Sequence, residues 1–264
     1  MFHLRVMRLF MTTNICLYSD LHCEFGNPDI KIPDEAEIVI LAGDIDTRLL
    51  MNLQVFVREN LDKTFLYVPG NHDFYGKDYS EQLAYIQSIV SIHENLHILH
   101  DSEYQHKDIT FCGSTLWTDF TAYGPVSEVW CKKNIKGMIG DFWQIGDGNG
   151  KISTTKMVEL NRQAKRGIGD FLQATDGKKV VITHFPPLAC CKHGQIEENK
   201  LSAYFTNNLT YLFHKEYSPD YWLYGHNHWS DSMEVGKTKL LSNQHGYPGE
   251  NNSRYDPGGC MFKL

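Results

Sequence analysis

Side chains of the kinds that bind metal ions recur in short clusters along this sequence. The candidates are Asp20, His22, Asp44, Asn71, His184, His226 and His228. The first two and the last two are spaced two positions apart, so on an extended chain each pair points to one side and can grip one ion. Asp44 and Asn71 each follow a glycine, which lets the chain turn sharply. Seven ligands crowd a single ion, so we expect two ions with one carboxylate bridging them.

The candidate ligands mix imidazole nitrogen with oxygen atoms. Such a mixture suits Mn²⁺, Fe, Zn²⁺ or Ni²⁺ better than Mg²⁺ or Ca²⁺, which prefer oxygen alone. The expected cofactors are therefore two divalent transition-metal ions, with Mn²⁺ as the first choice. Two ions about 3.5 to 4 Å apart clamp phosphoryl oxygens and generate a hydroxide for in-line attack. The chemistry expected from these residues is hydrolysis of a phosphate ester by a metal-bridging hydroxide.

Each cluster follows a short apolar run of the length of a strand. These runs cover residues 14–19, 37–41, 64–68, 179–183 and 221–224. In open α/β sheets, binding sites form just beyond the carboxyl ends of the strands, which is where all five clusters fall. The expected strands and the candidate ligands therefore point to one and the same site.

Helical patterns between the strands predict an α/β protein. One covers residues 153–173 with Ser153 as its N-cap, and another starts at Asp78, where Glu81 completes a capping box. Further strands, some without a helix between them, are expected at 109–117, 238–243 and 260–264. The pattern as a whole predicts two packed sheets with helices outside them.

The candidate ligands are spread from Asp20 to His228, so residues 14–264 are most simply one domain. Residues 118–150 break into glycine and aromatic residues without a clear period, and they predict an irregular insertion of the kind that often forms a lid or binding loop. Residues 1–13 predict an N-terminal extension without a signal-peptide pattern, and we assign them no function.

Composition narrows the class of protein. Of the 264 residues, 42% are apolar and 22% are charged, which is ordinary for a globular protein and excludes disorder as its main state. No stretch approaches the roughly 18 consecutive apolar residues of a membrane span. The net charge of −7 opposes general binding to nucleic acid or to anionic membranes. Seven cysteines without a Cys-x-x-Cys pair predict reduced thiols in a cytoplasmic protein.

The clusters resemble the calcineurin-like metallophosphoesterases, whose sequence blocks read D-x-H, G-D, G-N-H-[DE], H and G-H-x-H in this order. All five blocks occur here, at residues 20–22, 43–44, 70–73, 184 and 225–228. The resemblance spans most of the chain, and five ordered blocks are far more specific than any one of them. It implies a four-layer αββα double β-sandwich.

The resemblance also implies a role for each residue. One metal would be held by Asp20, His22 and His228, and the other by Asn71, His184 and His226. Asp44 would bridge the two metals. His72 would stay off the metals and act as a general acid or as a hydrogen-bond donor to the transition state. Some protein phosphatases of the family orient that histidine with an Asp three residues after the bridging one, but Thr47 stands there. The partner of His72 is left open, and a protein phosphatase is disfavoured.

The flanks of the blocks resemble a narrower group of small bacterial-type members, which includes cyclic-nucleotide phosphodiesterases. Residues 19–25, 74–76 and 115–119 match that group. Where the group tends to read N-P-R-G-Y, this chain has His245 in place of the Arg, which implies weaker or pH-dependent phosphate binding. Tyr75, Trp117 and His245 are the candidate substrate contacts.

We expect a small phosphate-ester substrate, with a phosphodiester of nucleotide type favoured. The alternatives are a phosphomonoesterase or protein phosphatase, a nuclease, and a non-catalytic metal-binding scaffold. A nuclease of this fold needs a basic groove, against which the net charge of −7 argues. Scaffolds among the relatives usually lose ligands, and this chain retains all of them. The sequence does not indicate an oligomeric state.

Overall fold

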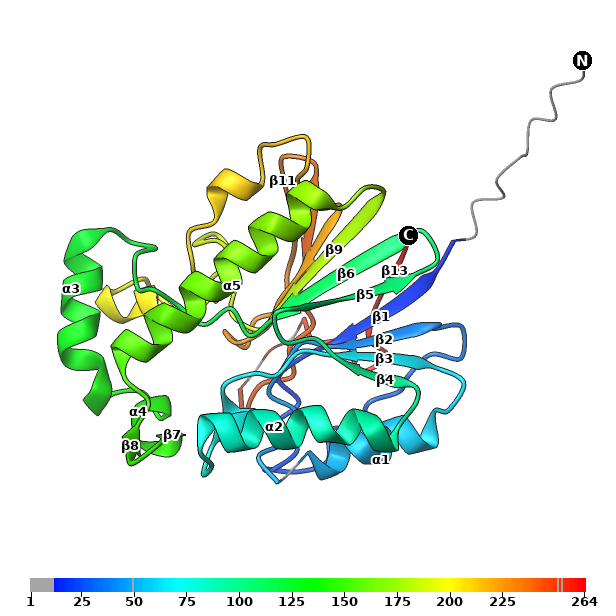
Figure 1. Cartoon of the computed structure of the whole chain (residues 1–264), viewed down its shortest axis with the longest axis horizontal. Helices are drawn as coiled ribbons and strands as arrows, with labels where there is room; N and C mark the ends of the chain where they lie inside the picture. The colour runs from blue at the N-terminus through cyan, green and yellow to red at the C-terminus, as the bar shows by residue number, and fades with distance from the viewer. Residues whose placement is uncertain (1–11, 49, 251, 253) are drawn as a thin grey trace, which may run out of the picture.

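Two packed β-sheets form the centre of the computed structural model, which describes residues 12–48, 50–250, 252 and 254–264 (Figure 1). Among these residues the first sheet has five strands, in the order β13-β1-β2-β3-β4, and the second has six, in the order β11-β12-β10-β9-β6-β5. The first sheet contains β1 (Asn14–Tyr18), β2 (Ile38–Leu41), β3 (Thr64–Tyr67), β4 (Leu96–Ile98) and β13 (Cys260–Lys263). The second contains β5 (Ser102–His106), β6 (Ile109–Ser114), β9 (Lys178–Thr183), β10 (Tyr221–Leu223), β11 (Ser232–Val235) and β12 (Thr238–Leu241).

Most strands of each sheet run parallel. Strands β1 to β4 are parallel, with β13 antiparallel at the edge. In the second sheet β6, β9, β10 and β12 are parallel, with β5 and β11 antiparallel at the edges. Because parallel strands end at the same edge of a sheet, the loops that follow them gather there.

Helices cover the outer face of each sheet (Figure 1). Helices α1 (Met51–Glu59) and α2 (Tyr79–Ile89) lie along the first sheet, and α5 (Thr154–Ala174) lies along the second. This arrangement confirms the α/β, four-layer αββα fold. Short 3-10 turns occur at η1 (His72–Phe74), η2 (Val90–Ile92), η3 (Ile135–Gly137), η4 (Lys200–Tyr204) and η5 (Thr210–Leu212).

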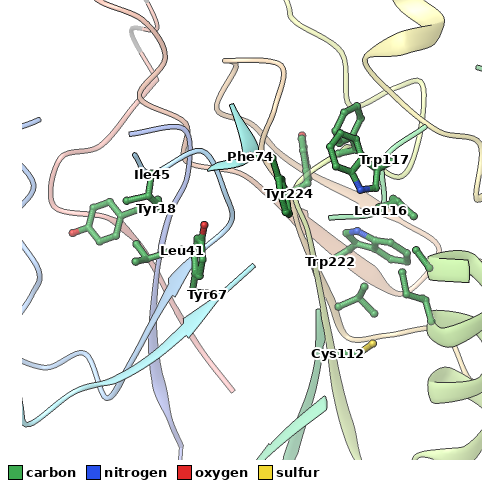
Figure 2. Packing of buried hydrophobic residues seen from close by; sticks show 14 of the residues in the cluster. Tyr18, Leu41, Ile45, Tyr67, Phe74, Cys112, Leu116, Trp117, Trp222 and Tyr224 are labelled. Carbon is green, nitrogen blue, oxygen red and sulfur yellow. The ribbon is translucent and has the colours of Figure 1, made fainter. Parts of the chain in front are cut away.

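Alternate residues of β1 pack into two different apolar clusters. Ile15 and Leu17 lie in the cluster between the sheets, whose members come from strands of both. Cys16 and Tyr18 lie in the cluster that includes residues of the outer helices, and Figure 2 shows Tyr18 in this packing. Both faces of the strand are therefore buried, which explains why it reads as an uninterrupted apolar run.

The expected N-caps of the two amphipathic helices, Ser153 and Asp78, are confirmed, whereas the capping box expected with Glu81 stays a prediction. The Ser153 Oγ accepts a hydrogen bond from the backbone N of Lys156 at 3.0 Å, so Ser153 is the N-cap of α5. The Asp78 carboxylate accepts bonds from the backbone N atoms of Ser80 and Glu81 at 2.9 and 3.3 Å, so Asp78 is the N-cap of α2. Both side chains satisfy backbone donors that the first helical turn leaves without partners.

The region 118–150, expected to be irregular, contains regular structure. It holds α3 (Pro125–Asn134), η3, α4 (Asp141–Gln144) and a hairpin of β7 (Gly146–Asp147) and β8 (Gly150–Lys151). Helix α3 begins at Pro125 directly after Gly124, whose φ is 84°. In α3 only Cys131 is fully buried, and Val126 and Val129 are 69% and 67% exposed, so its apolar residues do not form a stripe that faces the core.

The predicted N-terminal extension, residues 1–13, lies outside the described residues except for Thr12 and Thr13. Thr13 is buried, and it exchanges two backbone hydrogen bonds with Leu264, at 2.7 and 3.2 Å. These bonds continue the pairing of β1 with β13. None of the helices in the described part of the chain is long and apolar enough to cross a membrane.

Candidate metal centre

The seven candidate ligands lie in turns that follow the carboxyl ends of β1, β2, β3, β9 and β10. Five of them have left-handed backbone conformations: φ is 54° at Asp20, 46° at His22, 55° at Asp44, 79° at His226 and 54° at His228. For residues other than glycine such conformations cost about 1–3 kcal/mol each and persist where the surrounding structure enforces them. Their concentration here makes the turns a candidate functional site.

Glycines let these turns approach one another closely. A Cβ on Gly70 would lie 2.1 Å from Asp44 Oδ1, and one on Gly225 would lie 2.1 Å from Ser19 Oγ and 2.5 Å from Asp20 Oδ2. Gly43 has φ of 94°, and a Cβ there would lie 2.4 Å from His184 Nδ1. The glycines of the three blocks are thus required by space, and Gly43 is required by its conformation as well.

One group of ligands brings two imidazole nitrogens face to face. The Nε2 atoms of His22 and His228 are 3.0 Å apart, and His228 Nε2 is 3.5 Å from Asp20 Oδ1. On the far sides of the rings, His22 Nδ1 lies 3.1 Å from Glu24 Oε1 and His228 Nδ1 lies 2.6 Å from Glu250 Oε2. Because an ionised carboxylate only accepts, each Nδ1 carries the proton and each Nε2 offers a lone pair to the same space. A cation fits there.

The second group also turns acceptor atoms inward. His184 Nε2 lies 2.9 Å from Asn71 Oδ1 and 3.3 Å from Asp44 Oδ2, while His226 Nδ1 lies 3.1 Å from Asn71 Oδ1. Two donors of this group are used elsewhere: Asn71 Nδ2 donates to Asp141 Oδ1 at 2.9 Å, and His184 Nδ1 donates to the Ala42 carbonyl at 2.9 Å. His226 Nε2 is buried without a hydrogen-bond partner among the described residues. Oxygen and nitrogen acceptors so arranged fit a divalent ion.

The charges of the second group also favour a cation. Burial would lower the pKa of His184, but Asp44 and Asp20 raise it to about 9. Burial would raise the pKa of Asp44, but His184, His72 and His22 hold it well below its usual range. Asp44 is therefore ionised, and its negative charge attracts a cation. A proton on His184 and a metal ion compete for this position.

Asp44 connects the two groups. It lies with His184 and His226 in one set of closely spaced ligand atoms and with His22 and His72 in another, and Asp20, His22 and His228 form a third. The structure thus brings together all seven residues that the sequence singles out. The residues present fit two divalent ions that share Asp44. The ring of Phe185 stacks on the ring of His226, with 3.7 Å between the ring centroids.

His72 lies beside this centre, and the structure supplies the partners that the sequence left open. Its Nδ1 is 3.5 Å from Glu24 Oε1, its Nε2 is 2.9 Å from the Tyr247 hydroxyl, and its ring stacks on Tyr75 at 4.0 Å. Its backbone N donates to Asp44 Oδ1 at 2.8 Å. Burial would lower the pKa of His72, but the nearby carboxylates, Asp44 first, raise it above its usual value.

Glu24 and Tyr247 are site residues that sequence reasoning missed. Glu24 is nearly buried, and its Oε1 serves both His22 and His72. Burial would raise the pKa of Glu24, but these hydrogen bonds lower it to about 2. The spacing of Glu24, two residues after His22 as His22 is two after Asp20, was an available signal. Tyr247 offered none, since it is 175 residues from His72.

A cavity of about 670 Å³ opens over the metal centre. Its lining includes Asp44, Asn71, His72, His226 and His228. Of the three candidate substrate contacts, Tyr75 lines this cavity.

The structure places the other two candidate contacts away from the cavity. Trp117 is buried in the apolar cluster between Phe74 and Phe185, with 2% of its surface exposed. Figure 2 shows it beside Leu116. His245 turns its Nδ1 to the Gly246 carbonyl at 2.9 Å. Neither belongs to the cavity lining. Trp117 lies in the core, and His245 Nδ1 is bonded to the carbonyl of its own turn, so a substrate contact by either residue stays a prediction.

Known proteins support this description of the fold. Residues 13–230 match the family model described as Calcineurin-like phosphoesterase. "Uncharacterized protein L509" of Acanthamoeba polyphaga mimivirus is 28% identical over 275 residues, which cover 89% of this chain and 91% of that protein.

Two solved structures share the fold. The phosphopantetheinyl hydrolase PptH from Mycobacterium tuberculosis superposes with a TM-score of 0.74 at 17% identity, covering 96% of this chain and 95% of that one. The protein TT1561 of Thermus thermophilus superposes with a TM-score of 0.51 at 12% identity, covering 89% of this chain and 90% of that one.

Proposed function

This chain belongs to the calcineurin-like phosphoesterase family, and from that premise we propose that it is a two-metal phosphodiesterase acting on a diester of nucleotide type. Membership makes it a metal-dependent phosphoesterase. The number of ions, the residues that hold them and the preference for a diester are the parts that we propose. Mn²⁺ is the ion we favour, because the candidate ligands mix nitrogen and oxygen.

One observation carries the proposal. Two sets of inward-facing acceptor atoms, one with Asp20, His22 and His228 and one with Asn71, His184 and His226, share the carboxylate of Asp44. In the proposed enzyme these residues hold two ions. Bound there, the ions supply an activated water nucleophile and positive charge for the phosphoryl oxygens.

The chain's own residues complete the reaction. Water adds its oxygen to phosphorus and releases one proton to the solvent, and the bond from phosphorus to the leaving oxygen breaks. His72 donates a proton to the leaving oxygen and then takes one from the solvent. Glu24 holds His72 at Nδ1, and the Tyr247 hydroxyl lies at the opposite nitrogen, Nε2. The leaving oxygen therefore either displaces the Tyr247 hydroxyl from His72 Nε2 or receives the proton through that hydroxyl.

The charge of the cavity supports a diester. A phosphodiester carries one negative charge near pH 7, whereas a monoester carries about 1.5 to 2. Among the described residues that line the cavity none is an arginine, and the one lysine, Lys192, pairs with Glu198 at 2.5 Å. Among the described residues, the lining thus offers no unpaired lysine or arginine for the additional charge of a monoester.

The first test compares bis-p-nitrophenyl phosphate with p-nitrophenyl phosphate in the presence of Mn²⁺. We expect faster cleavage of the diester. The Asp44→Asn variant is the blank, because it removes the shared carboxylate charge. Faster cleavage of the monoester, or turnover equal to the blank while metal remains bound, would contradict the phosphodiesterase proposal.

A second comparison tests the nucleotide part. Thymidine 5′-(p-nitrophenyl phosphate) and phenyl p-nitrophenyl phosphate release the same leaving group and differ in the other arm. A higher kcat/KM for the nucleotide supports a nucleotide-type substrate, and a lower one contradicts it. A phosphopantetheinyl ester belongs in the same screen, because the structurally similar M. tuberculosis protein is named for hydrolysing that group.

A further inference from the structure

The cavity extends beyond the metal centre between two walls of apolar side chains. One wall comes from the region that contains α3 and η3, and the other comes from the segment around η4. The apolar residues that line the cavity are Tyr123, Met138 and Ile139 on the first wall and Ile196, Leu201 and Phe205 on the second. A volume of about 670 Å³ falls in the range of sites that enclose a whole small molecule.

Buried polar contacts hold the two walls together. The Thr118 hydroxyl donates to the carbonyls of Ala203 and Thr206, both at 3.0 Å, and Cys131 Sγ lies 3.0 Å from the Lys200 carbonyl. These contacts join residues 69 to 88 positions apart in the sequence. The walls are therefore built into the fold before any ligand binds, which reduces the entropic cost of binding.

Asp141 ties both walls to the metal centre. It accepts hydrogen bonds from Asn71 Nδ2 at 2.9 Å, from the Tyr75 hydroxyl at 2.8 Å and from the Tyr204 hydroxyl at 2.6 Å. Asn71 is a candidate ligand, and Tyr75 and Tyr204 line the cavity. The apolar walls and the metal centre are thus parts of one rigid site.

Apolar surface on the walls is left for a ligand to cover. Met138 is 50% exposed and Ile196 is 61% exposed, and both line the cavity. Covering such side chains with an apolar group removes them from water, which favours binding in proportion to the area covered.

The charged side chains near the walls are already paired. Lys192 pairs with Glu198, and Glu250 accepts from His228 Nδ1 at 2.6 Å and from the backbone N of Tyr247 at 2.9 Å. Among the described lining residues no unpaired lysine or arginine is left to bind a second phosphate.

We propose that these walls bind an uncharged, predominantly apolar arm of the substrate, while its single phosphate lies at the metal centre. This inference rests on the proposed phosphodiesterase function and narrows it. The substrate class is a phosphodiester with one phosphate and one uncharged arm, such as a nucleoside, an alkyl or an acyl-amide group. Nucleoside diphosphates, nucleoside triphosphates and oligonucleotides carry additional phosphates and fall outside it.

Three synthetic diesters with one leaving group test the arm. Methyl, hexyl and 5-carboxypentyl p-nitrophenyl phosphate present the same scissile bond, and only the arm changes. Each fully buried methylene contributes roughly fourfold in affinity, so we expect the hexyl ester to exceed the methyl ester in kcat/KM by at least about tenfold. The carboxylate should remove most of this gain. Equal kcat/KM for the methyl and hexyl esters would overturn the inference and leave the phosphodiesterase proposal standing.

Two wall variants locate the arm. Met138→Asp and Ile196→Asp should each reduce the ratio of hexyl to methyl kcat/KM toward one. Leu61→Asp is the matched control, because Leu61 is 74% exposed and outside the cavity lining, and it should leave that ratio unchanged. Far-ultraviolet circular dichroism and thermal unfolding establish that each variant is folded. A ratio that both wall variants leave unchanged would place the arm elsewhere.

A binding measurement tests the arm without turnover. Methyl methylphosphonate and hexyl methylphosphonate carry one charge and have no good leaving group. In isothermal titration calorimetry of the Mn²⁺-loaded protein, the hexyl compound should bind at least about tenfold more tightly, with a more negative heat-capacity change. If all three esters resist hydrolysis yet this preference holds, the phosphodiesterase proposal fails and the arm site stands. Equal binding of both phosphonates overturns the arm site.

Discussion

At the scale of single residues, the centre depends on which atom of each side chain faces inward. Glu24 and Glu250 hold the Nδ1 atoms of His22 and His228, so both Nε2 atoms face the same space. Asp141 does the same for Asn71, because it takes the amide donor and leaves the oxygen facing His184. Residues that touch the ligands from behind thus decide what the ligands can bind.

His72→Ala tests the separation of catalysis from metal binding. Loss of a general acid typically costs about 10²- to 10⁴-fold in rate, so turnover of a dialkyl phosphate, whose alkoxide leaving group needs that proton, should fall by that factor. Bound metal, measured by inductively coupled plasma mass spectrometry, should stay at the level of the unmodified chain. Asp44→Asn is the contrast, since it should lower both. Equal metal loss in the two variants would refute the assignment of His72 as the acid.

Glu24→Gln tests the role of the carboxylate behind His22. The amide keeps the size of the side chain but removes the charge that orients two imidazoles. Because such partners typically contribute about 10- to 100-fold in metal affinity, competition with a fluorescent chelator should show Mn²⁺ binding weakened by that factor. Glu59→Gln, at an exposed position on α1, is the control. Unchanged affinity in Glu24→Gln would mean that the carboxylate does not orient His22.

At the scale of elements, glycines act differently in turns and in helices. Gly70→Ala would place a Cβ 2.1 Å from Asp44 Oδ1, whereas a Cβ on Gly167 of α5 meets nothing within 4 Å. We expect Gly167→Ala to stabilise the fold by about 0.5 to 1 kcal/mol, because alanine is the better helix former. Gly70→Ala should destabilise it and lower the bound Mn²⁺. Urea unfolding and metal analysis measure both, and a Gly70→Ala variant with normal metal content would contradict the close packing.

Asp141, at the start of α4, connects elements that are far apart in the sequence. Asp141→Leu leaves the donors of Asn71, Tyr75 and Tyr204 without their acceptor. Since a buried donor without a partner costs about 1 to 3 kcal/mol, we expect the free energy of unfolding to fall by about 3 kcal/mol or more. Asp141→Asn keeps an oxygen acceptor and should lose less. Equal losses in urea unfolding would show that the cost comes from volume rather than hydrogen bonding.

Most strands, the caps of α2 and α5 and the clustering of seven side chains could be predicted because their signals are local. Each ligand lies within a few residues of the end of an apolar run, and Ser153 and Asp78 cap the turns that they precede. Tyr247 and Asp141 could not be predicted, because their partners His72 and Asn71 lie 175 and 70 residues away. Helix α3 was not predicted for a different reason: it is short, and its apolar residues Val126 and Val129 lie on the exposed side rather than in a stripe that faces the core.

At the scale of the whole molecule, the candidate ligands come from both sheets. Asp20, Asp44 and Asn71 follow strands of the first sheet, and His184, His226 and His228 follow strands of the second. The sheets already meet here through the backbone N of His226, which donates to the Asp20 carboxylate at 2.9 Å. Ions bound by both sets would cross-link the two halves of the sandwich at the edge where their acceptor atoms face one another.

Metal removal should therefore lower the stability of the entire fold. An ion present at about 100 times its dissociation constant stabilises the native state by roughly 2.7 kcal/mol, which for a chain of this size corresponds to a rise in Tm on the order of 5–10 °C. We expect chelation with EDTA to lower Tm by that amount and Mn²⁺ to restore it. In Asp44→Asn the shift should be much smaller, because the carboxylate that both ion positions share loses its charge. If the chelated and Mn²⁺-supplemented proteins unfold at the same temperature, the ligands of the two sheets do not hold a common metal centre.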